Sequence, residues 1–408
     1  VVAGLVIFLL AGAEPLLAWH TDLHPLLAET AFSHLPEDIK KALKPHFPVL
    51  IEGTLAPDLV LQDWSNQEWN VHAPFREQGG GPARVNELWT SCVGLLRSET
   101  EDPASAAFEM GLLAHYLADL NDPLNTDVSE DEDLMAAVYE ADAMADILTP
   151  FYVYRGIFHV SDPDALAREA AEQANWYYHA VVDAYLHGGG YRNATAITRL
   201  AARRGVDDIL DAWVTLWLSA QSSDPSVGVR INQTVLQPGD TVRLSLSLLP
   251  GPEESIPTDV YVIMWNDRGD MAFIGPDSAC TGQPVAWKAS WRGREASAEQ
   301  VLAFPLGLEV PLGEYYASAV LVAAGRNPFD LSAWMGAAQT VSLTVMALTE
   351  APLADLTDEV YLFPAQWPGE EDLVALPLKR WDLLFLGGRE NEPETEYDET
   401  LTDHLIPG

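Results

Sequence analysis

The spacing of apolar residues changes character once along the chain. Between residues 19 and 222 apolar positions recur every three or four residues, as in LHPLLAETAFSHL and ASAAFEMGLLAHYLADL, which predicts α-helices. After SSDPS, the segment VGVRINQTVLQPGDTVRLSLSLLP alternates apolar and polar residues around a Pro-Gly-Asp turn, which is typical of half-buried antiparallel strands. We therefore expect a multi-domain α and β protein. An all-α helical bundle over 19–222 precedes an Ig-like antiparallel β-sandwich over 227–347.

The two ends of the chain differ from this pattern. The first thirteen residues, VVAGLVIFLLAGA, are too short to span a bilayer but have the length of a signal h-region. We expect residues 1–18 to be a signal peptide whose basic n-region is missing, and the mature protein to be secreted, periplasmic or on the cell surface. Cleavage after Ala13 gives the better small-x-small match, whereas cleavage after Ala18 exposes Trp19, and both remain open. Residues 349–408 are predicted to form an acidic, Pro-rich tail.

Charge narrows the range of partners. The 408 residues include 61 acids and 22 bases, for a net charge of -39. Such a charge repels polyanions, so nucleic acid is an unlikely partner. Two cysteines, Cys92 and Cys280, are too few for a disulfide framework or a thiolate zinc site.

The motif HYLAD carries the clearest chemistry. His115 and Asp119 are four residues apart in an apolar helix, so both side chains lie on one face and can reach a single cation. Alone, the pair is better explained as a structural pair or a helix-surface hydrogen bond. Upstream, however, His24 begins the first predicted helix, and Asp58 is followed fourteen residues later by His72. Neutral imidazole and carboxylate are the ligands that zinc takes outside thiolate sites.

In order and spacing these residues resemble the zinc-dependent phospholipase C and single-strand nuclease superfamily. Its members are exported all-α enzymes that hold a trinuclear zinc cluster. The positions that match the family pattern are Trp19, His24, Asp58, His72, His115 and Asp119. The phrase GTLAPD is also similar to a Gly-x-x-Ala-Pro-Asp stretch of bacterial members. The resemblance covers about 200 of the 408 residues.

The resemblance implies two zinc sites that share one carboxylate. The implied ligands are Asp58, His72, His115 and Asp119 for one ion, and Asp119, His24 and Trp19 for the other. Asp119 would bridge the ions. The contribution of Trp19 is its backbone, and a free α-amino group there requires cleavage after Ala18. His20 is a fallback ligand, or a cap of the first helix.

The third site of the family is degraded in this sequence. The next family histidine falls on Asn125, and the His-x-x-x-Glu helix aligns on residues 136–140, where Ala136 replaces histidine and Glu140 is kept. We expect about two zinc ions and, at most, a weak third cation site at Asn125 and Glu140. The acids at 131–133 could assist it, but a solvated helix start explains them better.

The implied activity is that of a phospholipase C-like hydrolase of the EC 3.1.4 class, reduced by the loss of the third site. Zinc lowers the pKa of bound water from 15.7 towards 7, and Asp58 is the expected general base or water-orienting group. The expected substrate is a phospholipid or a small phosphodiester, with membrane or cell-surface contact through the β-sandwich. The alternatives are a catalytically degenerate zinc-binding or surface adhesion module, and a single-strand-specific nuclease.

Overall fold

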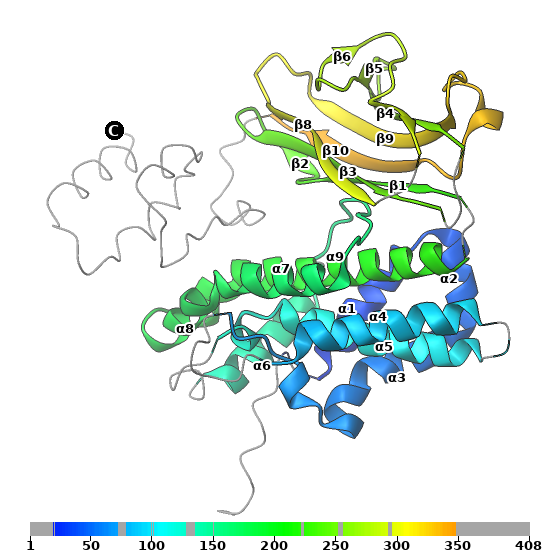
Figure 1. Cartoon of the computed structure of the whole chain (residues 1–408). Helices are drawn as coiled ribbons and strands as arrows, with labels where there is room; N and C mark the ends of the chain where they lie inside the picture. Colours follow the sequence, from blue (N-terminus) through cyan, green and yellow to red (C-terminus); the bar gives the residue numbers. More distant parts are fainter. Residues whose placement is uncertain are drawn as a thin grey trace, which may run out of the picture.

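The structure is a computed structural model, and it combines helices with β-sheets (Figure 1). The residues it describes are 19, 21–71, 79–98, 100, 102–127, 135–149, 151–221, 224–251, 256–292 and 296–347. The predicted signal peptide and acidic tail therefore lie outside the described residues, as do His20, His72 and the acids at 131–133. The expected mixture of α and β structure is confirmed, whereas the Ig-like class of the second part stays a prediction.

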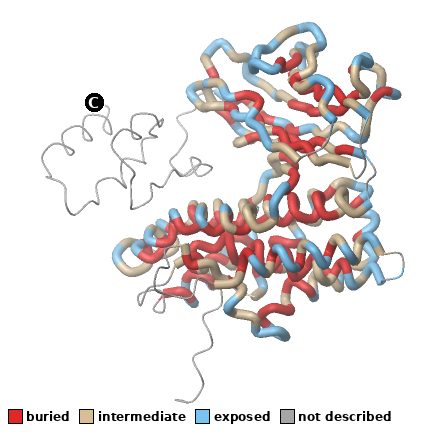
Figure 2. Tube along the Cα trace, in the orientation of Figure 1, coloured by how far each residue is buried: buried red, intermediate tan, exposed pale blue. Residues whose placement is uncertain are grey.

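The helical part of the chain ends at Gln221. Its α-helices are α1 (Leu23–Ser33), α2 (Glu37–Leu43), α3 (Phe47–Ala56), α4 (Gly81–Arg97), α5 (Pro103–Leu120), α6 (Ala136–Ile147), α7 (Pro163–Asn175), α8 (Tyr178–Leu186) and α9 (Tyr191–Gln221). Short turns connect them: η1 (Lys44–His46), η2 (Pro57–Leu61), η3 (Trp64–Asn66) and η4 (Pro123–Asn125). The burial colours in Figure 2 show that α5 and much of α9 are buried, so these two helices form the centre of the helical core.

Two glycines bring α3 and α5 into unusually close contact. A Cβ atom added at Gly53 would lie 2.3 Å from the carbonyl oxygen of Phe108, and one added at Gly111 would lie 2.0 Å from that of Leu50. Only glycine allows such an approach of two helix backbones. This contact matters because α3 leads directly into η2, which carries Asp58, and α5 carries His115 and Asp119.

The helices differ from the sequence prediction in three places. The apolar periodicity over 164–186 predicts one long helix, but the helix is interrupted between α7 and α8. There the side chain of Asn175 donates to the carbonyl oxygen of Thr126 instead of facing solvent. Conversely, the segments ATAITRLAARRG and VDDILDAWVTLWLSA, whose apolar spacing predicts two helices divided at Gly205, form the single helix α9. In it that glycine packs near Leu27 and Ala118. The third difference is an extended segment over 151–160, described below.

The strands form two sheets that share a core. A three-stranded sheet has the order β1 (Ser226–Ile231), β3 (Thr241–Leu249), β8 (Ser297–Pro305). The larger sheet has the order β2 (Val235–Leu236), β10 (Gln339–Val345), β9 (Gly313–Ala323), β4 (Thr258–Asn266), β5 (Met271–Ile274), β6 (Cys280–Thr281), with β7 (Lys288–Trp291) also paired to β4. Buried residues of both sheets, such as Val229, Leu246 and Val262, belong to one cluster.

The larger sheet is mixed, where the sequence predicted an antiparallel one. The two-residue strand β2 runs parallel to β10. Two hydrogen bonds hold β2 against β10. Thr344 N–H donates to the carbonyl of Thr234, and Met346 N–H donates to that of Leu236. Because this strand follows β1 of the other sheet after only a short connection, it reaches β10 in the parallel direction.

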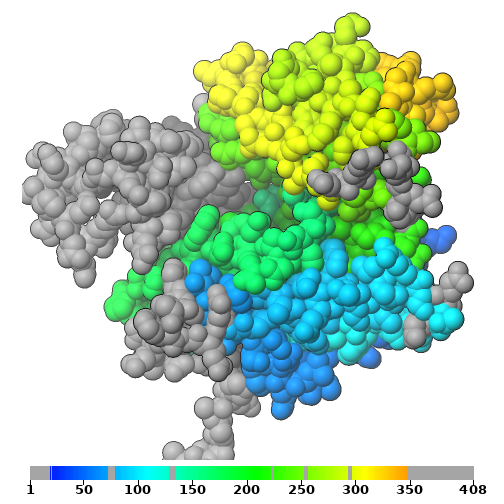
Figure 3. All heavy atoms as spheres, viewed as in Figure 1, coloured from blue at the N-terminus to red at the C-terminus, as the bar shows by residue number. Residues whose placement is uncertain are grey.

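The extended segment 151–160 joins the helices to the sheets. Ile157 N–H donates to the carbonyl of Val229 at 3.1 Å, and Ile231 N–H donates to that of Arg155 at 2.9 Å. The segment therefore extends the edge of β1, which an isolated helical domain would not do. In Figure 3 the sheets (green to orange) lie against the helical part (blue to green). Among the described residues, no helix combines the length and the apolar character needed to cross a membrane.

Candidate metal centre

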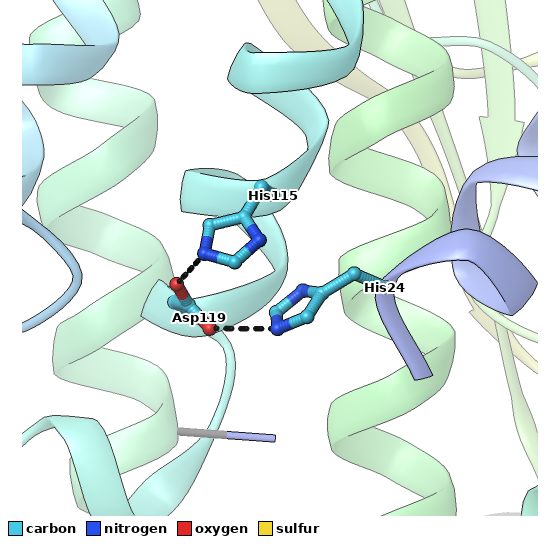
Figure 4. A group of neighbouring side chains, drawn as sticks. All are labelled: His24, His115 and Asp119. Carbon is cyan, nitrogen blue, oxygen red and sulfur yellow. Dashed lines mark ion pairs between the residues drawn. The ribbon is translucent and has the colours of Figure 1, made fainter. Parts of the chain in front are cut away.

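Three buried side chains from two helices meet inside the helical part (Figure 4). His24 lies in the first turn of α1, while His115 and Asp119 lie on one face of α5, as their spacing predicts. Nε2 of His24 is 3.4 Å from Oδ1 of Asp119, and Nε2 of His115 is 3.0 Å from Oδ2 of the same carboxylate. The two imidazole rings stack with centroids 3.9 Å apart. Each oxygen of Asp119 thus faces a different histidine.

The backbone of α3 fixes the orientation of His115. Nδ1 of His115 lies 2.8 Å from the carbonyl oxygen of Thr54, which can only accept a hydrogen bond. The proton of the neutral ring is therefore on Nδ1, and the lone pair of Nε2 faces the carboxylates of Asp119 and Asp58. A carbonyl that holds the far nitrogen of an imidazole in this way is the usual support of a metal-ligating histidine.

The oxygens and nitrogen at the centre lack hydrogen bonds to compensate their burial. In the described part of the chain neither oxygen of Asp119, nor Nε2 of His115, nor Oδ2 of Asp58 has a hydrogen-bond partner. Although His115 and Asp119 are only 3.0 Å apart, their atoms are not aligned for a hydrogen bond. Buried polar atoms are normally paired, so this group calls for a further partner.

The geometry of these atoms fits a divalent cation. Ligand atoms about 2.0–2.2 Å from a tetrahedral zinc ion lie about 3.3–3.6 Å from one another. The separations of 3.0 and 3.4 Å within the group are close to that range. One ligand atom from each of His24, His115 and Asp119 can be chosen so that all lie within 4.8 Å of one another. The donor set, two imidazoles and a carboxylate, is one that zinc accepts.

Burial and charge make the centre retain protons. Burial raises the pKa of Asp119 to about 6, against the opposing effect of His115. Burial alone would lower the pKa of His115, but Asp119, Asp58 and the carbonyl of Thr54 outweigh it, so that pKa is raised above its ordinary value. A divalent cation would replace these protons, because metal ligands bind in their deprotonated forms.

Asp58 lies at the edge of the centre. Its Oδ1 is 3.4 Å from Nε2 of His115 and accepts a hydrogen bond from the side-chain amide of Gln67 at 2.9 Å. It is not a member of the compact group of three, but it faces the same nitrogen of His115 that faces Asp119. At 6% exposure, Asp58 is the least buried of the four residues, so the centre is closest to solvent on the side of η2.

The backbone of Trp19 contacts Asp122, a residue that the sequence did not single out. The backbone N–H of Trp19 donates to Oδ2 of Asp122 at 3.1 Å, and both residues are buried. Asp122 also accepts from Leu124 N–H, so it holds the chain that follows α5. The start of the described chain is therefore anchored three residues beyond Asp119.

The expected third site lies only partly within the described residues, since the acids at 131–133 are outside them. The side chain of Asn125 donates to the backbone carbonyl of Asp119 at 2.9 Å, which is a structural role. Glu140 is buried in α6, but the group at His24, His115 and Asp119 is the only cluster of possible metal ligands found among the described residues.

Four supporting residues were not found from the sequence: Thr54, Gln67, Asn121 and Asp122. Asn121 follows α5, and its side chain donates to Asp208 on α9 at 2.8 Å and to the carbonyl of Leu117. Two of these four residues could have been found in HYLADLND, where polar Asn121 and Asp122 follow an apolar helix directly. Thr54 acts through its backbone, so its side chain gave no signal.

Comparisons with known proteins leave the family open. No protein-family model and no curated protein matches the chain. Among solved structures, the sporulation control protein Spo0M from Bacillus subtilis is 13% identical over 30% of this chain, with a TM-score of 0.18. The chain spans 49% of the length of Spo0M. The alkylpurine DNA glycosylase AlkC of Pseudomonas fluorescens, bound to DNA containing an abasic site analog, is 11% identical over 80% of this chain and 98% of its own, with a TM-score of 0.17. At these scores neither likeness supports a statement on fold or function.

Proposed function

We propose that the protein is an exported zinc-dependent phosphodiesterase that acts on phospholipids in the manner of a phospholipase C. One observation carries the proposal: the buried carboxylate of Asp119 directs its two oxygens at two imidazoles and has no hydrogen bond in the described part of the chain. Such an arrangement is costly unless a cation joins it. The resemblance described above supplies the reaction class.

The proposed number of metal ions follows from Asp119. Because Oδ1 is near His24 and Oδ2 is near His115, one ion on each side of the carboxylate would make Asp119 a bridge. Asp58 and His72 would complete the site of His115, and Trp19 that of His24. The backbone N–H of Trp19 donates to Asp122, three residues after Asp119, and cleavage after Ala18 would free this nitrogen as an α-amino group.

The chain's own groups have distinct roles in the proposed reaction. Bound zinc would supply a water of lowered pKa and positive charge for the phosphoryl oxygens. Asp58 would orient that water and accept its proton, since one of its oxygens is free of hydrogen bonds among the described residues. Gln67 holds the other oxygen of Asp58, and the carbonyl of Thr54 keeps His115 in the tautomer that binds metal through Nε2.

Charge favours a lipid or a small phosphodiester over a polynucleotide. With a net charge of -39 the protein opposes the approach of a nucleic acid strand. This weighs against the nuclease alternative. The third site, left with Glu140, would be weak, and activity would be reduced accordingly because each lost charge-stabilising group costs about 10²–10³-fold in rate.

A second candidate is a zinc-binding or surface adhesion module without catalysis. It is favoured by the depth of the centre, since His24, His115 and Asp119 are at most 1% exposed. Structural zinc sites are closed, whereas catalytic ones keep an open position for water. The two candidates differ in whether metal removal abolishes turnover or only lowers stability.

The decisive experiment combines metal content with turnover. We expect about two zinc ions per chain and hydrolysis of a chromogenic phosphocholine ester by the full-length mature protein. His115→Ala should lose both, whereas His187→Ala, a change at an exposed histidine, should lose neither. Zinc without turnover would favour the structural module, and absence of zinc from the wild-type protein would contradict both candidates.

A further inference from the structure

Three consecutive apolar side chains protrude from the turn that carries Asp58. Leu59, Val60 and Leu61 are 64%, 75% and 48% exposed. We call these three residues the apolar turn. Single exposed apolar residues are common on soluble proteins, but a contiguous group marks an interaction surface more often.

The local backbone holds the apolar turn outward and Asp58 inward. Residues Pro57–Leu61 form a π-helical turn, which Gln62 ends in the left-handed conformation with φ 52. Asp63 N–H closes the turn on the carbonyl of Pro57, and Gln67 fixes the carboxylate of Asp58. A single turn therefore joins an edge of the candidate metal centre to exposed aliphatic side chains.

We propose that the apolar turn inserts into the surface of a zwitterionic phospholipid bilayer and brings the candidate centre to the lipid headgroups. This inference rests on the proposed function for the reaction at that centre. The docking itself does not require turnover, so it can be measured separately. It also places the membrane contact on the helical part of the protein, whereas the sequence predicted it on the β-sandwich.

The size of the apolar turn favours a lipid surface over a protein partner. A stable protein–protein interface uses about 20–30 residues on each side. Here three side chains project from a short turn, and the residues on either side of them are buried Asp58 and polar Gln62. A few aliphatic side chains suffice for shallow insertion between lipid headgroups, because each one removes its apolar area from water.

The charge of the protein and the uncharged apolar turn favour a zwitterionic lipid. The apolar turn and Gln62 carry no charge in a chain that has 61 acids. The net charge of -39 repels anionic headgroups, so a bilayer of zwitterionic lipid is the surface that this turn can approach. Trp64, half-buried at the start of η3, adds an amphipathic ring of the kind that lies at membrane–water interfaces.

The test is partition of the full-length protein onto phosphatidylcholine vesicles, read by sedimentation within the first minute, before products accumulate. The variant combines Leu59→Ser and Val60→Ser, and Val60→Ser alone serves if the pair lowers the thermal midpoint. We expect partition to fall about tenfold or more. Zinc content and turnover of a soluble phosphocholine ester should be unchanged. Adding anionic lipid should weaken binding of the wild-type protein.

A matched control separates this surface from the sheets. Leu331, which follows β9, is 70% exposed, so Leu331→Ser removes a comparable apolar side chain from the other part of the protein. We expect this variant to partition like the wild type. Equal partition of the apolar-turn variant and the wild type would overturn the proposal, as would a stronger loss with Leu331→Ser.

Two further outcomes have defined meanings. A wild-type dimer in solution that the apolar-turn variant abolishes, without vesicle binding, would replace the lipid by a second copy of the chain and overturn the proposal. Vesicle binding that depends on the apolar turn but is not accompanied by turnover of any phosphodiester would support docking while contradicting the proposed function.

Discussion

Buried carboxylates occur in two regions of the helical part, and their negative charge is compensated differently in each. At the junction with the sheets, Asp207 accepts hydrogen bonds from Arg155 and from the hydroxyl of Tyr152, and Asp211 accepts from Arg230 of β1 at 2.6 Å. At the candidate centre, Asp119 and Asp58 face histidines, and no lysine or arginine within the described ranges forms an ion pair with either.

The pKa values separate Asp207 from Asp119, although burial raises the pKa of Asp211 at the junction to about 8 despite Arg230. At the junction burial alone would raise the pKa of Asp207, yet Arg155 and Arg230 hold it below its ordinary value. At the centre burial dominates and raises the pKa of Asp119 to about 6. A buried carboxylate with its own guanidinium is a structural ion pair, whereas one that faces neutral imidazoles needs a proton or an external cation.

Removing the guanidinium of Arg230 at the junction should have the largest effect on the free energy of unfolding. Arg230→Met leaves Asp211 and Asp207 without part of their compensation, and we expect a loss of about 3–5 kcal/mol in the free energy of unfolding. Chemical denaturation measures it. The folded fraction should still bind zinc, because Arg230 does not contact His24, His115 or Asp119. A variant that remains fully folded but loses its zinc would mean that the two regions are not separate.

Separating α3 from α5 should affect both stability and metal binding. Gly111→Ala would place a Cβ 2.0 Å from the carbonyl of Leu50, so we expect a cost of about 1–3 kcal/mol. Because the helices must move apart, the carbonyl of Thr54 would no longer hold His115, and zinc affinity should fall about 10–100-fold.

A second glycine provides the control. An added Cβ at Gly94, in the last turn of α4, meets no atom within 4 Å. Gly94→Ala should therefore stabilise the protein by about 0.5–1 kcal/mol and leave zinc affinity unchanged. Denaturation and zinc titration of both variants check this pair, and an equal response of the two would contradict the close-packing argument.

The smallest expected effect is on the pH dependence of stabilisation by zinc. The folded-state pKa of Asp119 is raised from 3.8 to about 6, so its contribution to metal-free stability is full below about pH 4 and lost as the pH rises through 6. His115 is raised from 6.5, so its contribution is lost above that value. The rise in thermal midpoint on adding zinc should therefore grow from pH 5 to pH 8.

Buried carboxylates at the junction do not alter the zinc-induced shift of the thermal midpoint. Burial raises the pKa of Asp208 to about 6 and that of Asp211 to about 8, which lowers stability at higher pH with or without zinc. Only the difference between zinc-bound and zinc-free protein reports the centre. His115→Ala should show little zinc-induced shift at any pH, and a full shift in that variant would place the metal elsewhere.

The sequence predicted the members of the centre better than their supports. The four-residue spacing placed His115 and Asp119 on one face of a helix, because helix geometry determines which residues share a face. That His24 of another helix joins them was implied only by the family resemblance. Thr54 and Gln67 support the centre through contacts between separate elements, which no local pattern encodes. The pairing of Arg230 with Asp211 likewise depends on how β1 meets α9.

For the fold, the sequence likewise predicted local structure better than contacts between separate elements. The change from helical to alternating periodicity near residue 222 agrees with helices that run to Gln221 and strands that begin at Ser226. The segment FYVYRGIFHV was included in the helical region, but it is extended because its backbone pairs with β1. The parallel pairing of β2 is also a tertiary property, since two residues are too few to carry a pattern.

The most direct test of the central claim is titration of metal-free, full-length protein with zinc, with released protons counted alongside bound metal. If Asp119 lacks an internal cation as described, the wild-type protein should bind about two zinc ions and release protons at pH 6. Asp119→Asn should lower the affinity more than about 100-fold while remaining folded. Wild-type affinity in Asp119→Asn, or no zinc bound by the wild-type protein, would contradict the account.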